Sequence, residues 1–449
     1  MVEHSDNLYE ETVVTEVVLL RSGNPRRLTE PAWRGTVELC AEAGVQILST
    51  PPDPPGGPED ALPPGLFTPV PEDATADEVA ALLAERGPEH VVHCADPDTL
   101  VRRDSAAARR YGHARGRAAE ADRAAAAFDT LLHKGRTRDL CANLDIDVAD
   151  GAWGPASDDR LRQRAARLLA AYGRVLVKDP EGWAGRGQSR PRTPDELSAA
   201  LDTHGRRPVV VEAFVPGEEI SVEVLTRHGQ GLALGWAVKG GTEEAGHPLH
   251  RLRLAPAGPV PAPLADRALR LCAAAGYEGI AELEFVVGAD GRARVLECNP
   301  RVSAISRIFA AGNGHSSTEL AVRAALAGVA ALPEPARKET VDRALPAELR
   351  PELLASLAAA PGVAWVHPVT DGFQPRVLMG GVAGGGRTDE AVRQVASLTG
   401  IDLMEALEQR RATVRRLAAE WNRPRPEKPA LPHSGAGRGA SGRIGLEVR

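Results

Sequence analysis

Two apolar segments joined by a tight turn constrain the fold of this chain more than any other feature. They lie within residues 279–298, and the turn between them is Ala-Asp-Gly at 289–291. Strand-type segments separated by a turn of this composition are typical of a β-hairpin. We therefore expect antiparallel strand pairing in the second half of the chain.

Acidic side chains share one face of this expected hairpin. Glu284 lies on its first strand, and Glu297 and Asn299 lie two residues apart on its second, because side chains alternate between the faces of a strand. Such oxygen ligands suit Mg²⁺ and leave room for phosphate oxygens. If the second strand continues, Arg301 lies on the same face and could hold a phosphate. An ordinary solvent-facing hairpin edge is the alternative.

Alternating helix and strand patterns open the chain. We expect strands at 12–20, 45–48 and 89–95, helices at 28–44 and 76–87, and a proline-rich loop over 51–68. This alternation is typical of an α/β domain with a parallel sheet.

The remainder of the chain has an α+β pattern. After a helical stretch over 100–131 we expect helices at 158–171, 193–203 and 262–275, and strands at 174–178, 208–214, 218–226 and 231–238. We divide the chain into an N-terminal domain over 1–125, a second domain over 126–335, a small C-terminal subdomain over 336–421 and a tail over 422–449. The tail is rich in Pro, Gly, Ser and Arg, so we expect it to be disordered.

Charge and cysteine content exclude several classes of protein. The 449 residues include 54 basic and 61 acidic ones, and the net charge of −7 argues against a protein that coats nucleic acid or anionic lipid. Five widely spaced cysteines without a CxxC predict neither a disulfide framework nor a thiolate zinc site. The acidic N-terminus is unlike a secretory signal, and no long apolar run occurs. We expect a soluble, cytoplasmic protein with no nucleic-acid or membrane partner.

A lysine and a glycine-rich loop form a second candidate site. Lys178 ends an apolar strand, and Gly182, Gly185 and Gly187 follow it. Glycines let backbone N–H groups approach phosphates, and the lysine adds a positive charge. The pattern indicates a lid over a nucleotide or, alternatively, a plain surface loop.

A third candidate is the bend within residues 209–224. A strand runs into Glu212, and a Val-Pro-Gly turn precedes Glu218 and Glu219. The backbone of such a strand can bind an adenine edge while a later carboxylate binds ribose hydroxyls. An ordinary hairpin would show the same pattern.

Taken together, the lysine-ended strand, the glycine loop, the E-x-F-x-x-G-x-E bend and the E-C-N-P-R hairpin resemble the ATP-grasp family over roughly residues 130–328. The resemblance implies a mixed α/β and α+β chain: an N-terminal parallel α/β domain of the kind that precedes an ATP-grasp module, an ATP-grasp fold, and a small C-terminal subdomain. It also implies ATP and Mg²⁺ as cofactors, with Mn²⁺ as an alternative metal.

The resemblance further implies roles for individual residues. The nucleotide-binding positions are Lys134, Lys178, Gly185, Gly187, the adenine hinge Glu212, Ala213 and Phe214, and the ribose carboxylate Glu219. The metal ligands are Glu284, Glu297 and Asn299, while Lys178 and Arg301 are the catalytic cations at the transferred phosphate. The candidates for binding a substrate carboxylate are Lys239, His247, His250, Arg251, Arg253 and Arg307, although a solvated basic run would have a similar composition. Asp179 and Cys298 depart from the residues usual in the family, and neither departure removes a ligand.

One glycine-rich segment imitates a different nucleotide motif. Residues 380–388 nearly match a P-loop, but Arg387 stands where that motif needs a lysine. We expect a tight turn of the C-terminal subdomain there.

These features predict an ATP-dependent ligase that forms an amide bond. ATP would phosphorylate a carboxylate, and an amine would then displace the phosphate. Amino acids or small peptides are the expected substrates, with specialised metabolism as one setting and a homodimer as a compatible assembly. Two alternatives stay open: a biotin-carboxylase-like or carbamoyl-phosphate-type enzyme that uses bicarbonate, and a non-catalytic nucleotide-binding module.

Overall fold

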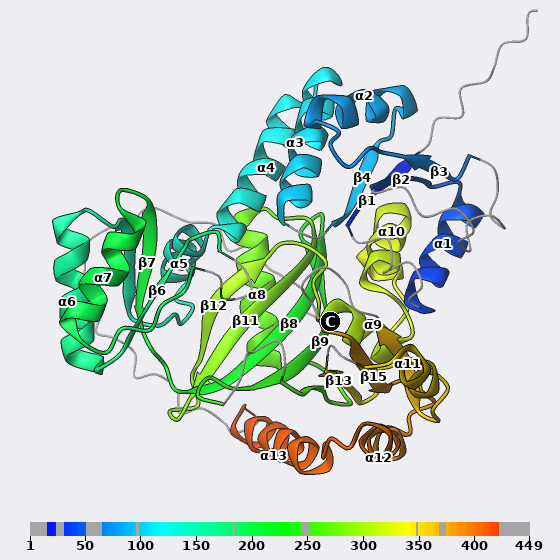
Figure 1. Ribbon diagram of the computed structural model, residues 1–449. Coiled ribbons are helices and arrows are strands. Elements are labelled where there is room, and N and C mark those ends of the chain that lie inside the picture. The colour runs from blue at the N-terminus through cyan, green and yellow to red at the C-terminus, as the bar shows by residue number, and fades with distance from the viewer. Residues whose placement is uncertain are drawn as a thin grey trace, which may run out of the picture. The chain divides into compact units, whose positions relative to one another are not determined.

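The computed structural model describes residues 16–23, 31–50, 65–95, 98–182, 185, 187–244, 251–346, 349–367 and 374–421. The chain forms two compact units, Met1–Pro25 with Val37–Asp122, and Arg26–Thr36 with Arg123–Arg449 (Figure 1). The expected tail over 422–449 lies outside the described residues, and so do His247, His250 and most of the proline-rich loop. No described helix is long and apolar enough to span a bilayer.

The first unit is built on a parallel four-stranded sheet with the order β3-β2-β1-β4, which confirms the predicted parallel arrangement. Its strands are β1 (Val17–Ser22), β2 (Gln46–Thr50), β3 (Phe67–Pro69) and β4 (His90–Ala95). The helices of this region are α1 (Pro31–Ala43), α2 (Ala76–Arg86) and α3 (Asp98–Ala114). Helix α2 begins at a capping box of Thr75 and Glu78, which satisfies its first backbone N–H groups.

Strand β3 corrects the expectation that residues 51–68 contain no regular structure. Phe67, Thr68 and Pro69 pair in parallel with β2. The strand lies at the edge of the sheet and is only three residues long. A proline is tolerated there because an edge strand does not need every N–H group for its ladder.

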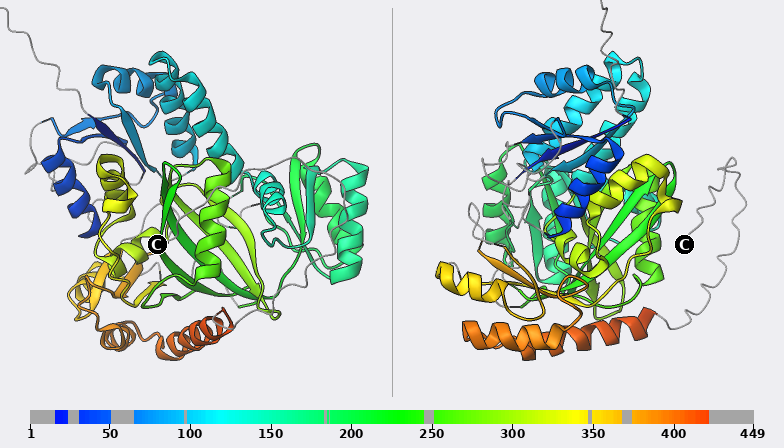
Figure 2. Two further views of the ribbon diagram at one scale, coloured as in Figure 1. Left: turned by 180° about the vertical axis from the view of Figure 1, so that it is seen from behind. Right: turned by 90° about the vertical axis from the view of Figure 1, so that its right-hand side faces the viewer.

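The second unit contains two antiparallel sheets. Its first part comprises α4 (Ala118–Leu132, which begins in the first unit), α5 (Lys134–Asn143), β5 (Gly151–Pro155), α6 (Asp159–Tyr172), β6 (Val175–Lys178), α7 (Pro194–His204) and β7 (Pro208–Ala213). Strands β5, β7 and β6 form a three-stranded sheet in that order. Helices α6 and α7 cover one face of this small sheet (Figure 2).

The large sheet has eight strands in the order β12-β11-β8-β9-β10-β13-β15-β14. They are β8 (Gly217–Arg227), β9 (Gln230–Gly241), β10 (Arg253–Ala255), β11 (Gly279–Gly288), β12 (Ala293–Asn299), β13 (Thr340–Ala344), β14 (Val363–His367) and β15 (Arg376–Gly380). The accompanying helices are α8 (Ala262–Ala275), α9 (Ser306–Asn313), α10 (Ser317–Ala327), α11 (Pro351–Ala358), α12 (Thr388–Thr399) and α13 (Met404–Trp421). The predicted hairpin is confirmed as β11 and β12.

The two faces of the large sheet differ in chemistry. Ile220, Phe285 and their apolar neighbours point to one face and pack against α8 and α13, while α11 and α12 extend this core over the later strands. Period-two alternation then sends Glu219, Glu284 and Lys239 to the other face. Helix α9 covers part of that second face through Ile308 and Phe309. The uncovered part is polar and borders a cavity.

The P-loop look-alike is a turn. Residues 381–386 have turn conformation between β15 and α12, as the sequence predicts.

Candidate functional site

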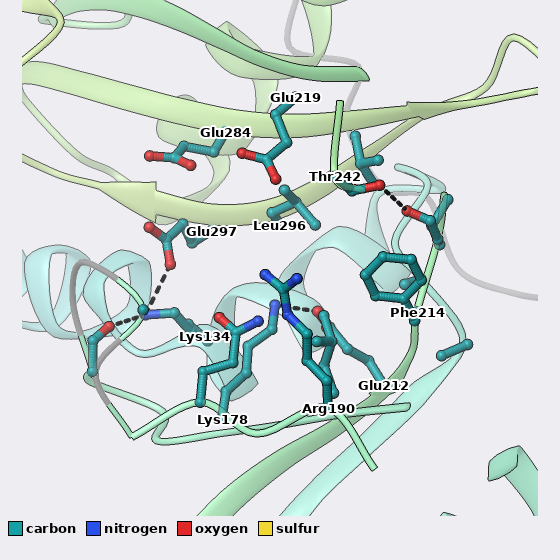
Figure 3. Close-up of a pocket in the computed structure, with 18 of the residues that line it drawn as sticks. Lys134, Lys178, Arg190, Glu212, Phe214, Glu219, Thr242, Glu284, Leu296 and Glu297 are labelled. Atoms are coloured by element: carbon teal, nitrogen blue, oxygen red, sulfur yellow. Dashed lines mark hydrogen bonds and ion pairs between the residues drawn. The ribbon is translucent and has the colours of Figure 1, made fainter. Parts of the chain in front are cut away.

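A cavity of about 310 Å³ lies between the two sheets of the second unit. Residues of α5 and the small sheet form one wall, and residues of the large sheet form the other (Figure 3). The first wall includes Lys134, Leu176, Lys178, Glu212, Ala213 and Phe214. The second wall includes Glu219, Lys239, Arg253, Glu284, Val286, Leu296 and Glu297. The cavity thus has a cationic wall opposite an acidic one, and apolar side chains line part of it.

Glu284 and Glu297 face each other directly across β11 and β12. Each is paired with a lysine: Lys239 Nζ lies 2.5 Å from Glu284 Oε2, and Lys134 Nζ lies 2.9 Å from Glu297 Oε2. Burial raises the pKa of Glu284. Burial acts in the same direction on Glu297, but Lys134 and the neighbouring lysines outweigh it and hold the pKa of Glu297 low. The cavity therefore contains at least one firmly ionised carboxylate.

Asn299 lies beside this pair but does not line the cavity. Its Nδ2 donates to Glu282 Oε2 over 3.3 Å, and Glu282 Oε1 accepts from Ser221. The side chain of Glu282, two residues before Glu284 on β11, is therefore already bound on both oxygens.

Arg301 departs from the expected strand geometry. Strand β12 ends at Asn299, and the N–H of Arg301 donates to the carbonyl of Asn299 over 2.8 Å, so the chain turns instead of continuing along the sheet. Period-two alternation therefore does not place Arg301 on the face of Glu297. Its side chain is not among those that line the cavity.

Lys178 is the last residue of β6, and a buried ion-pair chain holds it. Lys178 contacts Glu212, which is 2% exposed, and Arg138 Nη1 donates to Glu212 Oε2 over 2.8 Å. Arg138 lies one turn after Lys134 on α5, the spacing that brings two side chains to one face of a helix. Sequence reasoning missed Arg138, although this spacing was available to indicate it.

The glycine loop borders the cavity through Gly182, Gly185 and Gln188. Gly185 and Gly187 adopt φ values of 73° and 69°, in the left-handed region that favours glycine. Lys134 Nζ donates to the carbonyl of Gly182 over 2.5 Å, so α5 and the loop are joined at the cationic wall.

The bend after β7 has one backbone donor to spare. The N–H of Ala213 donates to the backbone carbonyl of Asp150 over 2.7 Å, and the N–H of Phe214 donates to the backbone carbonyl of Arg174 over 3.1 Å. The N–H of Val215, in contrast, has no hydrogen-bond partner among the described residues, and Val215 lines the cavity. The Arg174 guanidinium stacks 3.4 Å from the centroid of the Phe214 ring and fixes its orientation. The sequence could not indicate this unbonded N–H, because it depends on which N–H groups the nearby backbone carbonyls already accept from.

The other predicted residues divide between the cavity and its surroundings. Glu219 lines the cavity, and Arg251 Nη1 lies 3.5 Å from its Oε1 without lining the cavity itself. Lys239 is a lining residue, whereas Arg307 is not. Sequence reasoning assigned no site role to several lining residues, among them Arg190, Thr242 and Val215.

No protein-family model matches the chain, and no curated protein matches its sequence. Solved structures do match it. The biotin carboxylase domain of Hydrogenobacter thermophilus 2-oxoglutarate carboxylase, solved with MgADP, ADP and bicarbonate, superposes with a TM-score of 0.60 over 90% of this chain and 99% of that one, at 15% identity. The L-amino acid ligase of Bacillus licheniformis gives 0.61 at 16% identity over 86% and 97%. The N5-carboxyaminoimidazole ribonucleotide synthetase of Thermus thermophilus gives 0.60 at 19% identity over 86% and 99%.

These three proteins are ATP-grasp enzymes, and at such low identity the likeness establishes the fold. The chain therefore has the ATP-grasp fold, with a parallel α/β unit and a large antiparallel sheet, as the motifs predict.

Proposed function

We propose that this chain is an ATP-dependent carboxylate–amine ligase that joins amino acids or small peptides and releases ADP and phosphate. The observation that carries the proposal is the two-walled cavity, in which Lys134 and Lys178 lie opposite Glu284 and Glu297. Cations on one wall and carboxylates on the other suit a metal–polyphosphate complex, which needs both. Structural likeness to ligases of several kinds supports the same reading.

The apolar part of the cavity would hold the base of the nucleotide. Leu176, Val286 and Leu296 supply apolar contacts on both faces of a flat ring. The free N–H of Val215 would donate to a ring nitrogen. Glu219, at the start of β8, would accept hydrogen bonds from ribose hydroxyls.

The cationic wall would hold the phosphates. Lys134 and Lys178 supply positive charge, and the loop around Gly185 can bring backbone N–H groups close because it lacks side chains there. Arg138 would orient Lys178 through Glu212, whose carboxylate both cations hold.

The carboxylates fit a hard divalent cation such as Mg²⁺, or Mn²⁺ in its place. Glu284 and Glu297 offer oxygen ligands from adjacent strands, and Asn299 lies two residues beyond Glu297 on β12. When bound, such an ion would neutralise phosphate charge and polarise the transferred phosphoryl group. Without the ion, Lys134 and Lys239 neutralise the two carboxylates. The carboxylates can therefore stay close together before a metal binds.

The reaction follows from this arrangement. A carboxylate oxygen of the substrate attacks the γ-phosphorus, the bond to the β–γ bridging oxygen breaks, and ADP leaves. The amine of the second substrate then attacks the acyl carbon, phosphate departs, and an amide forms. The described residues contribute mainly position and charge neutralisation through Lys134 and Lys178, and Arg301 is the further cation predicted at the transferred phosphate.

The product nucleotide tests the proposal. The protein is incubated with ATP, Mg²⁺ and a panel of L-amino acids, singly and in pairs, and the nucleotides are separated. We expect ADP and phosphate in equal amounts, an amide product, and a hydroxamate when hydroxylamine replaces the amine. AMP with pyrophosphate would instead mean adenylation and would contradict the proposal.

The bicarbonate alternative is tested in the same assay, because a biotin carboxylase domain superposes on the chain as well as an amino-acid ligase does. ADP release that requires bicarbonate and no amino acid would support that alternative. Nucleotide binding with no ADP release under any condition would indicate a non-catalytic module.

A further inference from the structure

A row of charged side chains crosses one face of the large sheet. From β12 towards β15 it contains Glu297, Glu284, Lys239, Arg253, Asp342 and Arg376. The row begins at the cavity and continues into the strands that follow α10 in the chain. Strand β8 lies between the strands of Glu284 and Lys239, so the long side chain of Lys239 reaches across β8 to the carboxylate.

Most members of the row are paired. Lys239 forms an ion pair with Glu284, as described above. At the other end, Arg376 holds Asp342 through Nε, which lies 2.9 and 3.0 Å from the two carboxylate oxygens, and through Nη2 at 2.5 Å. The pKa of Asp342 lies below its usual value because its arginine neighbours, Arg376 first, outweigh the effect of burial. Asp342 is thus an ionised carboxylate that is already bound by a guanidinium.

Arg253 is the member of the row left without a close partner. Directly opposite Asp342 on β13, it approaches that carboxylate only to 3.8 Å, which is beyond hydrogen-bond length. Its Nε is buried with no hydrogen-bond partner among the described residues, and the whole residue is 4% exposed. Arg253 also lines the cavity, beside Lys239 and Glu284. A buried guanidinium with unused donors is costly, and an anion in the cavity would remove that cost.

We propose that Arg253 is the anchor for the carboxylate of the substrate that receives the phosphoryl group. A guanidinium presents two parallel N–H donors that match the two oxygens of a carboxylate. Its place beside Lys239 and Glu284 would hold that carboxylate next to the metal ligands, where a phosphoryl group has to arrive. The identity of the anion as a reacting substrate rests on the proposed function, whereas the existence of the anion site does not.

The charge balance favours a singly charged planar anion. Lys239 pairs with Glu284 and Arg376 with Asp342, so Arg253 is the cation of the row that has no close partner, and the buried carboxylate of Glu282 acts on it from nearby. A phosphate dianion would leave an excess negative charge beside two buried carboxylates. Bicarbonate shares the charge and the planar shape of an organic carboxylate, so the experiment has to separate these two sources.

A binding experiment tests the site without requiring turnover. Side-chain N–H signals of arginine are recorded by NMR on the full chain with MgADP present, and the Arg253→Lys variant identifies the Arg253 signal. Formate, bicarbonate and inorganic phosphate are the probes. A saturable shift of the Arg253 signal with formate or bicarbonate, and a much weaker one with phosphate, supports the site. No shift with either carboxylate probe, or tighter binding of phosphate, overturns it.

Turnover then identifies the source of the carboxylate. With Arg253→Met we expect the KM for the acid substrate to rise about 10- to 100-fold while the Kd for MgADP stays within twofold, because the lost contact is a charge-assisted hydrogen bond to the acid and not to the nucleotide. Arg227→Met is the matched control: this half-buried arginine ends β8 of the same sheet and does not line the cavity. It should leave both constants unchanged.

The outcomes of these experiments separate the two proposals. Stimulation of ADP release by amino acids but not by their amides, lost in Arg253→Met, supports an organic carboxylate. Stimulation by bicarbonate alone, lost in the same variant, supports Arg253 as the anchor while contradicting the amino-acid ligase. An Arg253→Met variant with an unchanged KM for the acid contradicts the anchor and leaves the ligase proposal standing.

Discussion

Lys134 Nζ lies 2.9 Å from Glu297 Oε2, so a lysine that we assign to phosphates is bound to a carboxylate that we assign to the metal. The two partners neutralise each other until a metal and a polyphosphate arrive together. The pairing of Lys239 with Glu284 repeats this relationship on the other carboxylate. It follows that the metal and the nucleotide should bind cooperatively.

The first prediction concerns that coupling. Mn²⁺ alone should bind weakly because it must displace lysines, and ADP should strengthen its binding by roughly 10- to 100-fold, the equivalent of one charge-assisted contact. Titration calorimetry with and without ADP measures the factor. In Lys134→Met the metal alone should bind more tightly than in the parent protein. Equal metal affinity with and without ADP would contradict the exchange of partners.

The second prediction concerns Glu297. Glu297→Gln keeps the shape of the side chain but removes its charge at the phosphates, so kcat for ADP release should fall by at least about 100-fold. Glu278→Gln, at an exposed acid just before β11, is the control and should retain activity. The thermal midpoints of both variants should stay close to that of the parent. ADP formation at the parent rate in Glu297→Gln would remove Glu297 from the metal site.

The third prediction concerns the buried pair of Arg138 and Glu212. Arg138→Met leaves a carboxylate that is 2% exposed with Lys178 as its remaining cation, so stability should fall by about 2–4 kcal/mol. Urea unfolding measures this loss. Adding Glu212→Gln in the same chain should recover part of it, because the unpaired charge is then gone. A double variant as unstable as the sum of the single ones would show that the pair is not coupled.

The fourth prediction concerns pH and Glu223, which is fully buried on β8 and accepts hydrogen bonds from Ser306 and from Ser317 over 2.6 Å. Burial raises the pKa of Glu223 from 4.5 to about 7. Between these values the folded protein holds a proton that the unfolded chain releases, so this group makes stability decline as pH rises through that window. Above the folded pKa the full cost, up to about 3 kcal/mol, persists.

Glu223→Gln tests this sign. The variant should match the parent near pH 4 and become more stable than the parent as the pH rises to 8, as measured by denaturant unfolding at each pH. Ser306 and Ser317 can still bond to the amide oxygen or accept from the amide nitrogen. A variant that is less stable than the parent at pH 8 would mean that Glu223 is held as a carboxylate in the folded state.

Local sequence signals predicted the elements of the fold well where a pattern ran for many residues. Helix α8 spans Ala262–Ala275 as the periodicity predicts, and the Asp290-Gly291 turn joins β11 and β12. Strand β3 was missed because Phe67–Pro69 is too short for an alternation and is stabilised by pairing with β2. The condition under which Arg301 would share the face of Glu297 is not met: β12 ends at Asn299, where Pro300 follows with no N–H for the ladder and the chain turns.

At the site, too, residues in local motifs could be predicted from the sequence, whereas features that depend on contacts distant in the sequence could not. Lys178, Glu284 and Glu297 stand in motifs whose spacing reports their roles, and the cavity brings them together. The spare N–H of Val215 and the unbonded Nε of Arg253 depend on which neighbouring groups already have partners. Those neighbours, such as Asp342, come from parts of the chain nearly ninety residues away, so no local pattern encodes them.

Strand β10, which has β9 on one side and β13 on the other, has a consequence for biosynthesis. Residues up to Ala255 leave the ribosome well before Thr340 does, so β10 has one unpaired edge for roughly 4–17 s at usual rates of translation. An open strand edge is a template for pairing with another chain. Because β10 is only three residues long, its unpaired edge exposes few N–H and C=O groups. The short strand therefore limits pairing of the nascent sheet with other chains until β13 is made.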